Sequence, residues 1–134
     1  MADNEFKVKI ITPDRVFYET DATMIEFTTT EGDIGVYANH VPLTAVLAPG
    51  EVHITTAGGV KVAAVHSGFS EILPDQVTLL AEVAEWPDEI DVSRAQEALK
   101  RAEDRLAKKT ENLDVARAEL EMRRALVRLN VAEK

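Results

Sequence analysis

The chain ends, from Asp88 to Lys134, in DEIDVSRAQEALKRAEDRLAKKTENLDVARAELEMRRALVRLNVAEK. This stretch contains no glycine, proline or aromatic residue, because every residue of these kinds lies at or before Pro87. Glycine and proline disfavour the interior of a helix, so their absence over such a length favours helices. The change in composition therefore predicts two parts, a turn-rich β part over residues 1–87 and a helical tail over residues 88–134.

Helical periodicity divides the tail into two helices, over about residues 91–107 and 113–131. Their apolar stripes are expected at Ala95, Ala98, Leu99, Ala102 and Leu106, and at Leu113, Ala116, Leu120 and Val127. A polar stretch over residues 108–112 is expected to be the break between them. Few of these apolar side chains are large, so we expect the packing of the tail itself to be weak.

The residues before Pro87 alternate between apolar and polar, as half-buried strands do. Strands are predicted over residues 6–10, 24–27, 52–54, 60–65 and 77–80. The turn signals between them are Pro13-Asp14, Glu31-Gly32-Asp33, Pro49-Gly50, Gly58-Gly59 and Pro74-Asp75. Trp86 is expected to anchor the linker or the core, and Pro87 to end the β part. The predicted fold class is α+β, an N-terminal antiparallel β-sandwich followed by a C-terminal two-helix hairpin.

The net charge of −9 is divided unevenly along the chain. Residues 1–89 hold 4 Lys+Arg against 15 Asp+Glu, whereas residues 90–134 hold 11 Lys+Arg against 9 Asp+Glu. The acidic body disfavours nucleic-acid binding, while the basic tail suits an anion or an acidic protein surface. The chain has no cysteine, no apolar run near the roughly 18 residues that span a bilayer, and no signal-peptide pattern. We therefore expect a cytoplasmic protein without a membrane-inserted segment or a disulfide.

Three motifs carry a resemblance to a known family. Residues 31–43 read EGDIGVYANHVPL, residues 66–74 read HSGFSEILP, and residues 77–82 read VTLLAE. They resemble signatures of the ε subunit of F-type ATP synthase, and the order and length of the two parts are similar over essentially the whole chain. The resemblance implies a central-stalk subunit that couples proton translocation to ATP synthesis and performs no chemistry itself.

The resemblance also implies how the two parts are used. The β-sandwich would dock on the γ subunit and on the membrane c-ring, with Glu31, Asp33 and His40 lying at the end of the sandwich that faces the c-ring. The helices would extend along γ, contact the α and β subunits of F1 and inhibit ATP hydrolysis. The expected location is the cytoplasmic face of the cell inner membrane, as a peripheral protein.

A narrower motif, IDVSRA, occupies residues 90–95. It resembles the I/L-D-x-x-R-A motif of ε subunits that bind ATP, especially those of the bacillus type. By this resemblance the expected ATP contacts are Glu85, Ile90, Asp91, Arg94, Ala95, Arg101, Arg124 and Arg128. ATP would act as a regulatory ligand and not as a catalytic cofactor, and a requirement for Mg²⁺ stays open.

Helical spacing independently brings the arginines together. Arg94 and Arg101 share one helix face, and Arg124 and Arg128 share another. If the hairpin folds about residue 110, position 94 lies beside position 126, between the two arginines of the second helix. Few carboxylates are evident among these guanidinium groups. Because they would be unpaired, the guanidinium groups would repel one another. A triphosphate would neutralise them with charge-assisted hydrogen bonds.

Simpler interpretations stay open for the same residues. Asp91 also fits a helix N-cap, or the third helical residue after a cap at Asp88. The arginines also fit an ordinary solvated face, paired with Glu97, Glu103, Glu119 and Glu121. The three histidines, His40, His53 and His66, join no carboxylate pattern, so no metal site is expected.

No nucleophile–base pair or phosphate-binding glycine loop is present in the sequence, so no catalytic residue is expected. Two functions therefore compete. One is a regulatory subunit whose folded tail binds ATP, and the other is a structural coupling subunit whose tail does not sense nucleotide. A free-standing hydrolase or metal enzyme has the least support.

Overall fold

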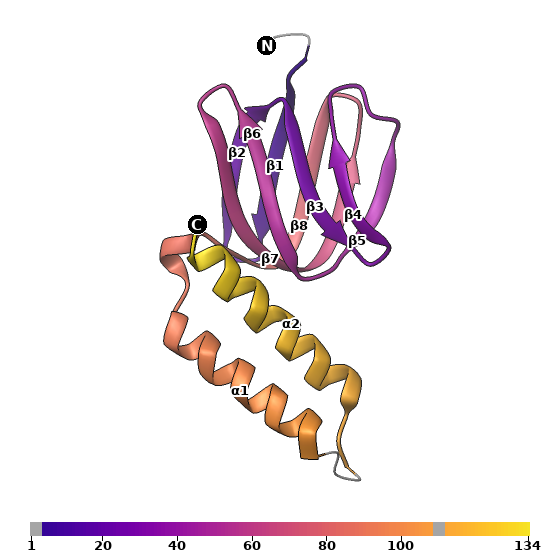
Figure 1. The fold of residues 1–134 in the computed structure, drawn as a ribbon. Helices are drawn as coiled ribbons and strands as arrows, with labels where there is room; N and C mark the ends of the chain where they lie inside the picture. The colour runs from indigo at the N-terminus through magenta and orange to yellow at the C-terminus, as the bar shows by residue number, and fades with distance from the viewer. Residues whose placement is uncertain (1–3, 109–111) are drawn as a thin grey trace.

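The computed structural model describes residues 4–108 and 112–134, in which a β part is followed by two helices (Figure 1). The described strands are β1 (Phe6–Thr12), β2 (Arg15–Ala22), β3 (Met24–Thr29), β4 (Gly32–Val36), β5 (Leu43–Leu47), β6 (Gly50–Thr56), β7 (Gly59–Ile72) and β8 (Gln76–Glu85). A short 3₁₀ helix, η1 (Pro87–Glu89), leads to α1 (Val92–Lys108) and α2 (Val115–Ala132). The predicted α+β fold class is confirmed.

Each predicted strand is present, and each predicted turn signal marks a junction between two strands. Three strands, β2, β4 and β5, were not predicted. Strand β2 buries only Phe17 and Ala22, at positions that do not fit a period of two. Strand β4 contains two glycines among its five residues, and β5 leaves most of its side chains exposed. These segments therefore lack the alternation on which the prediction depended.

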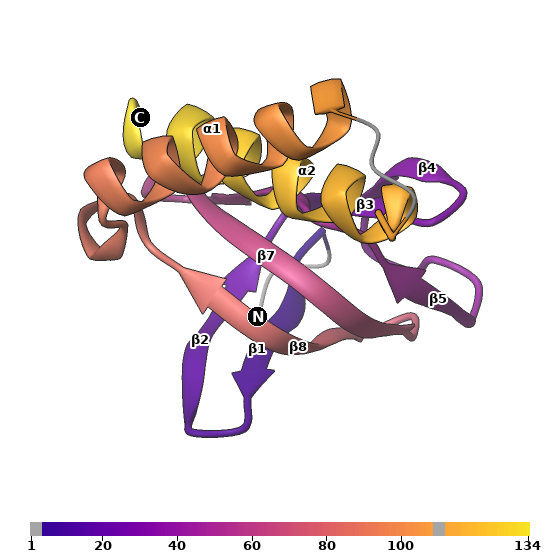
Figure 2. The ribbon, with the colours of Figure 1, turned by 90° about the horizontal axis from the view of Figure 1, so that it is seen from below.

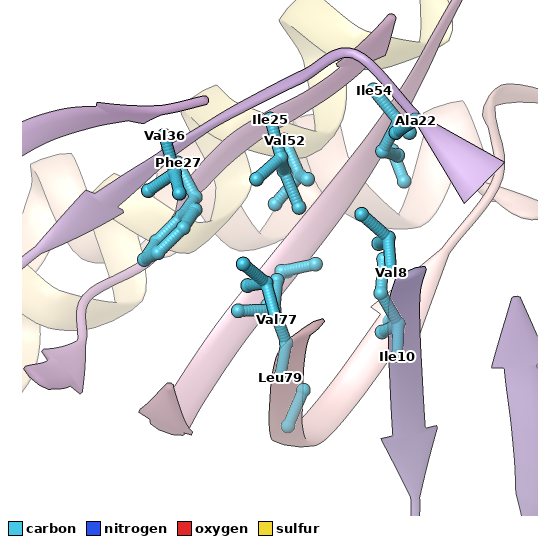
Figure 3. Packing of buried hydrophobic residues seen from close by; sticks show 14 of the residues in the cluster. Val8, Ile10, Ala22, Ile25, Phe27, Val36, Val52, Ile54, Val77 and Leu79 are labelled. Atoms are coloured by element: carbon cyan, nitrogen blue, oxygen red, sulfur yellow. The ribbon is translucent and has the colours of Figure 1, made fainter. Parts of the chain in front are cut away.

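Hydrogen bonding connects the strands in the order β2-β1-β8-β7-β5-β3-β4, and β6 pairs with both β3 and β7. The pairs are antiparallel apart from β1 and β8, which are parallel. The predicted sandwich is thus antiparallel with one parallel exception. Figure 3 shows side chains from β1, β3, β4, β6 and β8 pointing toward one another to form the apolar core. Strand β1 has the predicted alternation, because Phe6, Val8 and Ile10 are buried and the lysines between them are not.

The face that β7 presents to the core changes partway along the strand. Ala63 and Val65 belong to the main core, whereas beyond Gly68 the buried residues are Ser70 and Ile72. The change occurs where Ser67 and Gly68 have positive φ values of 55° and 130°. The first half of β7 can therefore cover the core with one face and carry α2 on the other.

Trp86 anchors the linker that follows β8, as predicted. Its ring stacks on Phe17, with centroids 4.4 Å apart, and meets Tyr18 edge-on at 5.2 Å. Glu89 accepts hydrogen bonds from the Arg15 guanidinium at 2.9 and 2.8 Å and from the Trp86 backbone N–H at 2.9 Å. The short η1 helix is thereby fixed to strand β2.

The two helices lie side by side, and α2 lies between α1 and one side of the β part (Figures 1 and 2). Both predicted helices are confirmed to within two residues at each end. Asp114 caps α2 by accepting the Arg117 backbone N–H at 3.0 Å. The predicted break over residues 108–112 lies partly outside the described residues.

The buried side chains of the hairpin are small. Ala95 and Ala102 of α1 and Ala118 and Ala125 of α2 are almost completely buried. The stripe expected on α2 was wrong at Ala116 and Leu120, which are exposed. The reason is that α2 has two buried faces: it packs on α1 and also contacts β6, β7 and η1. On the second face Val131 is buried in a small apolar cluster with Ala64 and Ile90.

We predict that Gly68→Ala lowers the free energy of unfolding by about 3–5 kcal/mol. A Cβ at this position would be strained by the positive φ and would collide with the carbonyl oxygen of Leu80. At Gly58 a Cβ would lie 3.7 Å from Thr56 Oγ1, an ordinary contact. Gly58→Ala should therefore change the stability by no more than about 0.5 kcal/mol. Urea unfolding of both variants checks this, and equal effects would contradict it.

Candidate functional site

A pocket of about 470 Å³ lies between the two helices and the end of strand β8. Its lining consists of Glu85, Glu89, Asp91, Arg94, Ala95, Ala98, Arg101, Arg105, Glu121, Arg124 and Arg128. Among these described residues arginine is the most numerous type, and the only apolar side chains of the lining are those of Ala95 and Ala98. The pocket is therefore suited to a polar ligand that carries negative charge.

Most of the residues expected to contact ATP line this pocket, and Ile90 does not. Ile90 is 8% exposed and packs in the small apolar cluster with Ala64 and Val131. The prediction had not included Glu89, Ala98, Arg105 and Glu121, which also line the pocket. Arg105 follows Arg101 by one helical turn, and Glu121 precedes Arg124 by almost one turn. Helical spacing is therefore the signal that would have found Arg105 and Glu121.

Asp91 acts as the N-cap of α1, one of the alternatives left open by the sequence. Its Oδ1 accepts the backbone N–H of Arg94 at 3.1 Å, and its carbonyl oxygen accepts that of Ala95 at 3.0 Å. Asp88 instead lies within η1. Because Asp91 also lines the pocket, the cap and a ligand contact are compatible roles for one side chain.

Two of the pocket arginines are paired with pocket carboxylates. Arg128 Nε donates to Glu85 Oε1 at 2.8 Å, and an Arg105 Nη donates to Glu121 Oε2 at 2.9 Å. The pocket thus contains more carboxylates than the sequence suggested. Glu121 is the one glutamate of the expected solvated face that pairs with an arginine in the described part of the chain.

The other three pocket arginines have no carboxylate partner within residues 4–108 and 112–134. Arg94 and Arg101 are exposed. Arg124 donates an Nη hydrogen bond to Ser67 Oγ at 3.2 Å, but its Nε is buried without a hydrogen-bond partner. A buried donor without a partner costs free energy, so this group in particular would gain from an anion.

Glu85 lies at the junction of β8, β7 and α2. Burial raises its pKa, but His66 and the Arg128 guanidinium together outweigh burial and hold the pKa below its ordinary value of 4.5. His66 is 1% exposed, and its Nε2 lies 3.3 Å from Glu85 Oε1 without the geometry of a hydrogen bond. Glu85 therefore remains ionised at neutral pH and holds Arg128 against the β part.

The register of the hairpin differs from the expected one. A fold about residue 110 would place Arg105 opposite position 115, whereas Arg105 contacts Glu121. The described ends of the connection explain the shift, since α1 continues to Lys108 and α2 begins only after the Asp114 cap. Residue 110 itself lies outside the described residues. The arginines nevertheless line one pocket because their side chains are long.

The residues expected to contact the c-ring or γ do not lie together. Glu31 and Asp33 flank the start of β4, and Asp33 Oδ1 accepts a hydrogen bond from Thr28 Oγ1 at 2.8 Å. His40 follows the other end of β4, where its Nδ1 is 2.7 Å from the carbonyl oxygen of Val41. Strand β4 spans roughly 16 Å at about 3.3 Å per residue. The expectation that the turn and the loop share one end of the sandwich was therefore wrong.

Among the residues that the structure describes, no three His, Asp or Glu side chains lie together in a way that could bind a metal ion. No helix within residues 4–108 and 112–134 combines the length and hydropathy needed to span a bilayer.

We predict that Glu85→Gln lowers the free energy of unfolding at neutral pH by roughly 1–2 kcal/mol, because Arg128 loses its ionised partner. The pKa of Glu85 is lower in the folded state than its ordinary value of 4.5. This stabilisation is therefore fully present above pH 4.5, and it is lost as the pH falls through the folded-state pKa. The difference between the native chain and E85Q should therefore shrink below pH 4.5. Urea unfolding at several pH values measures it.

Glu82→Gln is the control, because Glu82 is exposed on the same strand. It should have little effect at any pH. A deficit in E85Q that is independent of pH would contradict the role given to the Glu85 carboxylate.

Comparison with known proteins identifies the family. The model described as ATP synthase, Delta/Epsilon chain, beta-sandwich domain, matches residues 5–87, and that described as ATP synthase, Delta/Epsilon chain, long alpha-helix domain, matches residues 88–133. The ATP synthase epsilon chain of Halalkalibacterium halodurans is 49% identical over 126 residues, which cover 93% of this chain and 95% of that one. That of Bacillus velezensis is 46% identical over 126 residues, covering 94% and 96%.

Solved structures show the same fold. A chain of the Euglena gracilis mitochondrial ATP synthase, from an assembly of OSCP, F1 and c-ring, superposes with a TM-score of 0.82 at 22% identity, covering 97% of this chain and 82% of that one. The family models, the curated relatives and the arrangement of a β-sandwich with a helical hairpin agree. The chain therefore belongs to the delta/epsilon chain family of ATP synthase, as an epsilon subunit and not as the catalytic subunit.

Proposed function

We propose that the helical hairpin of this epsilon subunit binds ATP in its folded state and inhibits ATP hydrolysis when it extends. The observation that carries the proposal is the pocket in which three arginines, Arg94, Arg101 and Arg124, have no carboxylate partner in the described chain. In the assembled ATP synthase the subunit would couple proton translocation to ATP synthesis. ATP would be a regulatory ligand, with no catalytic cofactor.

The triphosphate of ATP matches the unpaired groups. Guanidinium groups bind phosphate oxygens in a bidentate manner, and such charge-assisted hydrogen bonds are stronger than neutral ones. Arg94 and Arg101 lie on α1 and Arg124 lies on α2, so a bound triphosphate would join the two helices. The buried alanines between the helices, Ala95, Ala102, Ala118 and Ala125, form a seam that buries little apolar surface. The ligand would therefore supply a large part of the stability of the folded hairpin.

The contacts between α2 and the β part would decide whether the hairpin opens. They include Arg128 with Glu85, Arg124 with Ser67, and Val131 with Ala64 and Ile90. Each is a limited contact, so the folded and extended states can be close in free energy. If ATP binds only the folded state, ATP at about 100 times its dissociation constant would favour that state by about 2.7 kcal/mol.

The β-sandwich would dock on two partners. The turn with Glu31 and Asp33 and the loop with His40 lie at opposite ends of β4, which suits contacts with two different partners, the c-ring and the γ subunit. The extended helices would present arginines to acidic segments of the β subunits, beside the α subunits of F1. This assembly would hold the protein peripherally at the cytoplasmic face of the cell membrane, without nucleic acid as a partner.

A structural coupling subunit without nucleotide sensing is the second candidate, and one observation favours it. Arg105 and Arg128 already have carboxylate partners inside the pocket. In this case ATP would leave the melting temperature of the subunit unchanged. Deletion of residues 90–134 would still change ATP hydrolysis by the assembled enzyme.

We predict that isothermal titration of the full chain shows ATP binding, and that Arg94→Gln weakens it by about tenfold or more because a charge-assisted contact is lost. Asp91→Asn keeps a good N-cap but removes the charge, so its effect reports on ligand contact and not on helix stability. Titrations with and without Mg²⁺ decide whether the metal is required.

Arg123→Gln is the matched control, since Arg123 is exposed on α2 and does not line the pocket. It removes the same charge and should change ATP affinity little. No heat of binding with the native chain, together with an unchanged melting temperature, would favour the structural coupling subunit.

A further inference from the structure

His66 is a buried titratable side chain that the site described above does not use. It is 1% exposed, and within residues 4–108 and 112–134 neither of its ring nitrogens has a hydrogen-bond partner. It lies on β7, against which α2 packs, and its Nε2 is 3.3 Å from Glu85 Oε1. The same oxygen of Glu85 accepts the hydrogen bond from Arg128 Nε at 2.8 Å. One carboxylate oxygen of the β part is therefore shared between a histidine of the sandwich and an arginine of the hairpin.

We propose that protonation of His66 releases α2 from the sandwich, because the imidazolium then pairs with Glu85 in place of Arg128. The inference goes beyond the proposed function, since it concerns the attachment of the hairpin and not the binding of a nucleotide. It makes the position of the helices sensitive to pH, with acidification favouring release.

The cations of α2 make a proton on His66 costly while the helix is attached. Besides Arg128, α2 contributes Arg124, which donates an Nη hydrogen bond at 3.2 Å to Ser67, the residue next to the histidine. A protonated His66 would be a third cation in a buried place where Glu85 is the counter-ion of Arg128. A buried charge without its own counter-ion is strongly unfavourable.

The carboxylates on the other elements that pack near this part of β7 have cations of their own. Glu51 of β6 lies 3.9 Å from the last residue, Lys134, as measured between Oε1 and Nζ. Glu89 of η1 binds Arg15 through both of its oxygens. Within the described part of the chain, Glu85 is therefore the carboxylate that a protonated imidazole would use.

The direction of the pH effect follows from which groups move. His66 and Glu85 both belong to the sandwich, so they stay together whether or not α2 is attached. Release of α2 removes Arg124 and Arg128 and exposes the ring to water, so the released form binds the proton more tightly. The attachment is therefore strongest above the pH at which histidine ordinarily titrates, about 6.5, and it weakens as the pH falls through this range. The pKa of Glu85 is below 4.5, so this carboxylate stays ionised throughout.

Energy transfer from Trp86 to a label on α2 measures the attachment in the full chain without nucleotide. Trp86 is the single tryptophan, and the chain has no cysteine, so Glu119→Cys provides one labelling position on an exposed part of α2. We expect the transfer to change between about pH 8 and about pH 6. The ratio of released to attached molecules should rise by up to about tenfold per pH unit, as for the uptake of one proton. His66→Gln should abolish this response, because the titrating group is removed.

His53→Gln is the matched control, since His53 lies on β6 with a partly exposed side chain, 3.8 Å from Glu51. Its response to pH should equal that of the native chain. Circular dichroism at each pH verifies that every variant is folded.

The imidazole NMR signal of His66 in the native chain is a second measurement, which requires no substitution in the core. It should shift over the same pH range in which the energy transfer changes. Transfer that is independent of pH in the native chain, an equal response in His66→Gln, or a signal that shifts in a different range would each overturn the proposal. Because no nucleotide is present, these results leave the ATP titration of the proposed function unaffected.

Discussion

The carboxylate of Glu85 connects the β part to the helical hairpin. It lies at the end of β8, accepts a hydrogen bond from Arg128 of α2 at 2.8 Å, and has the buried His66 of β7 beside it. Its ionisation is maintained against the cost of burial by these two neighbours. The position of α2, and through α2 that of α1, depends on a charge placed at the edge of the sandwich more than on a large apolar interface.

The hairpin itself combines close packing with few apolar contacts. Alanines at the seam let the helices approach each other, but each buries only a small area. The arginines at the edge of the seam then place positive charge where the helices meet. Such a hairpin gains more from an anion than a hairpin with a leucine seam would, because the apolar contribution to its stability is small and the repulsion between guanidinium groups remains.

The sequence predicted those elements whose pattern is local. The helices followed from a 3.6-residue period without glycine or proline, and strands such as β1 followed from alternation. Strands β2, β4 and β5 were missed because their residues are largely exposed or are glycine, so that pairing with neighbours decides their structure. For the pocket, the family motif and helical spacing indicated most of the lining. They did not indicate Ser67, His66 or the register of the hairpin, because these depend on contacts between residues far apart in the chain.

The attachment of η1 to β2 has a mechanical consequence. Glu89 is held by Arg15 in a two-point contact and Trp86 is stacked on Phe17, so the segment over residues 86–89 is fixed to the sandwich. The lever formed by the helices therefore begins at Ile90 and Asp91, past the point at which the composition changes. A force on the helices would therefore reach the sandwich both through the end of β8, which this segment follows, and through the contact of Glu89 with Arg15 of β2.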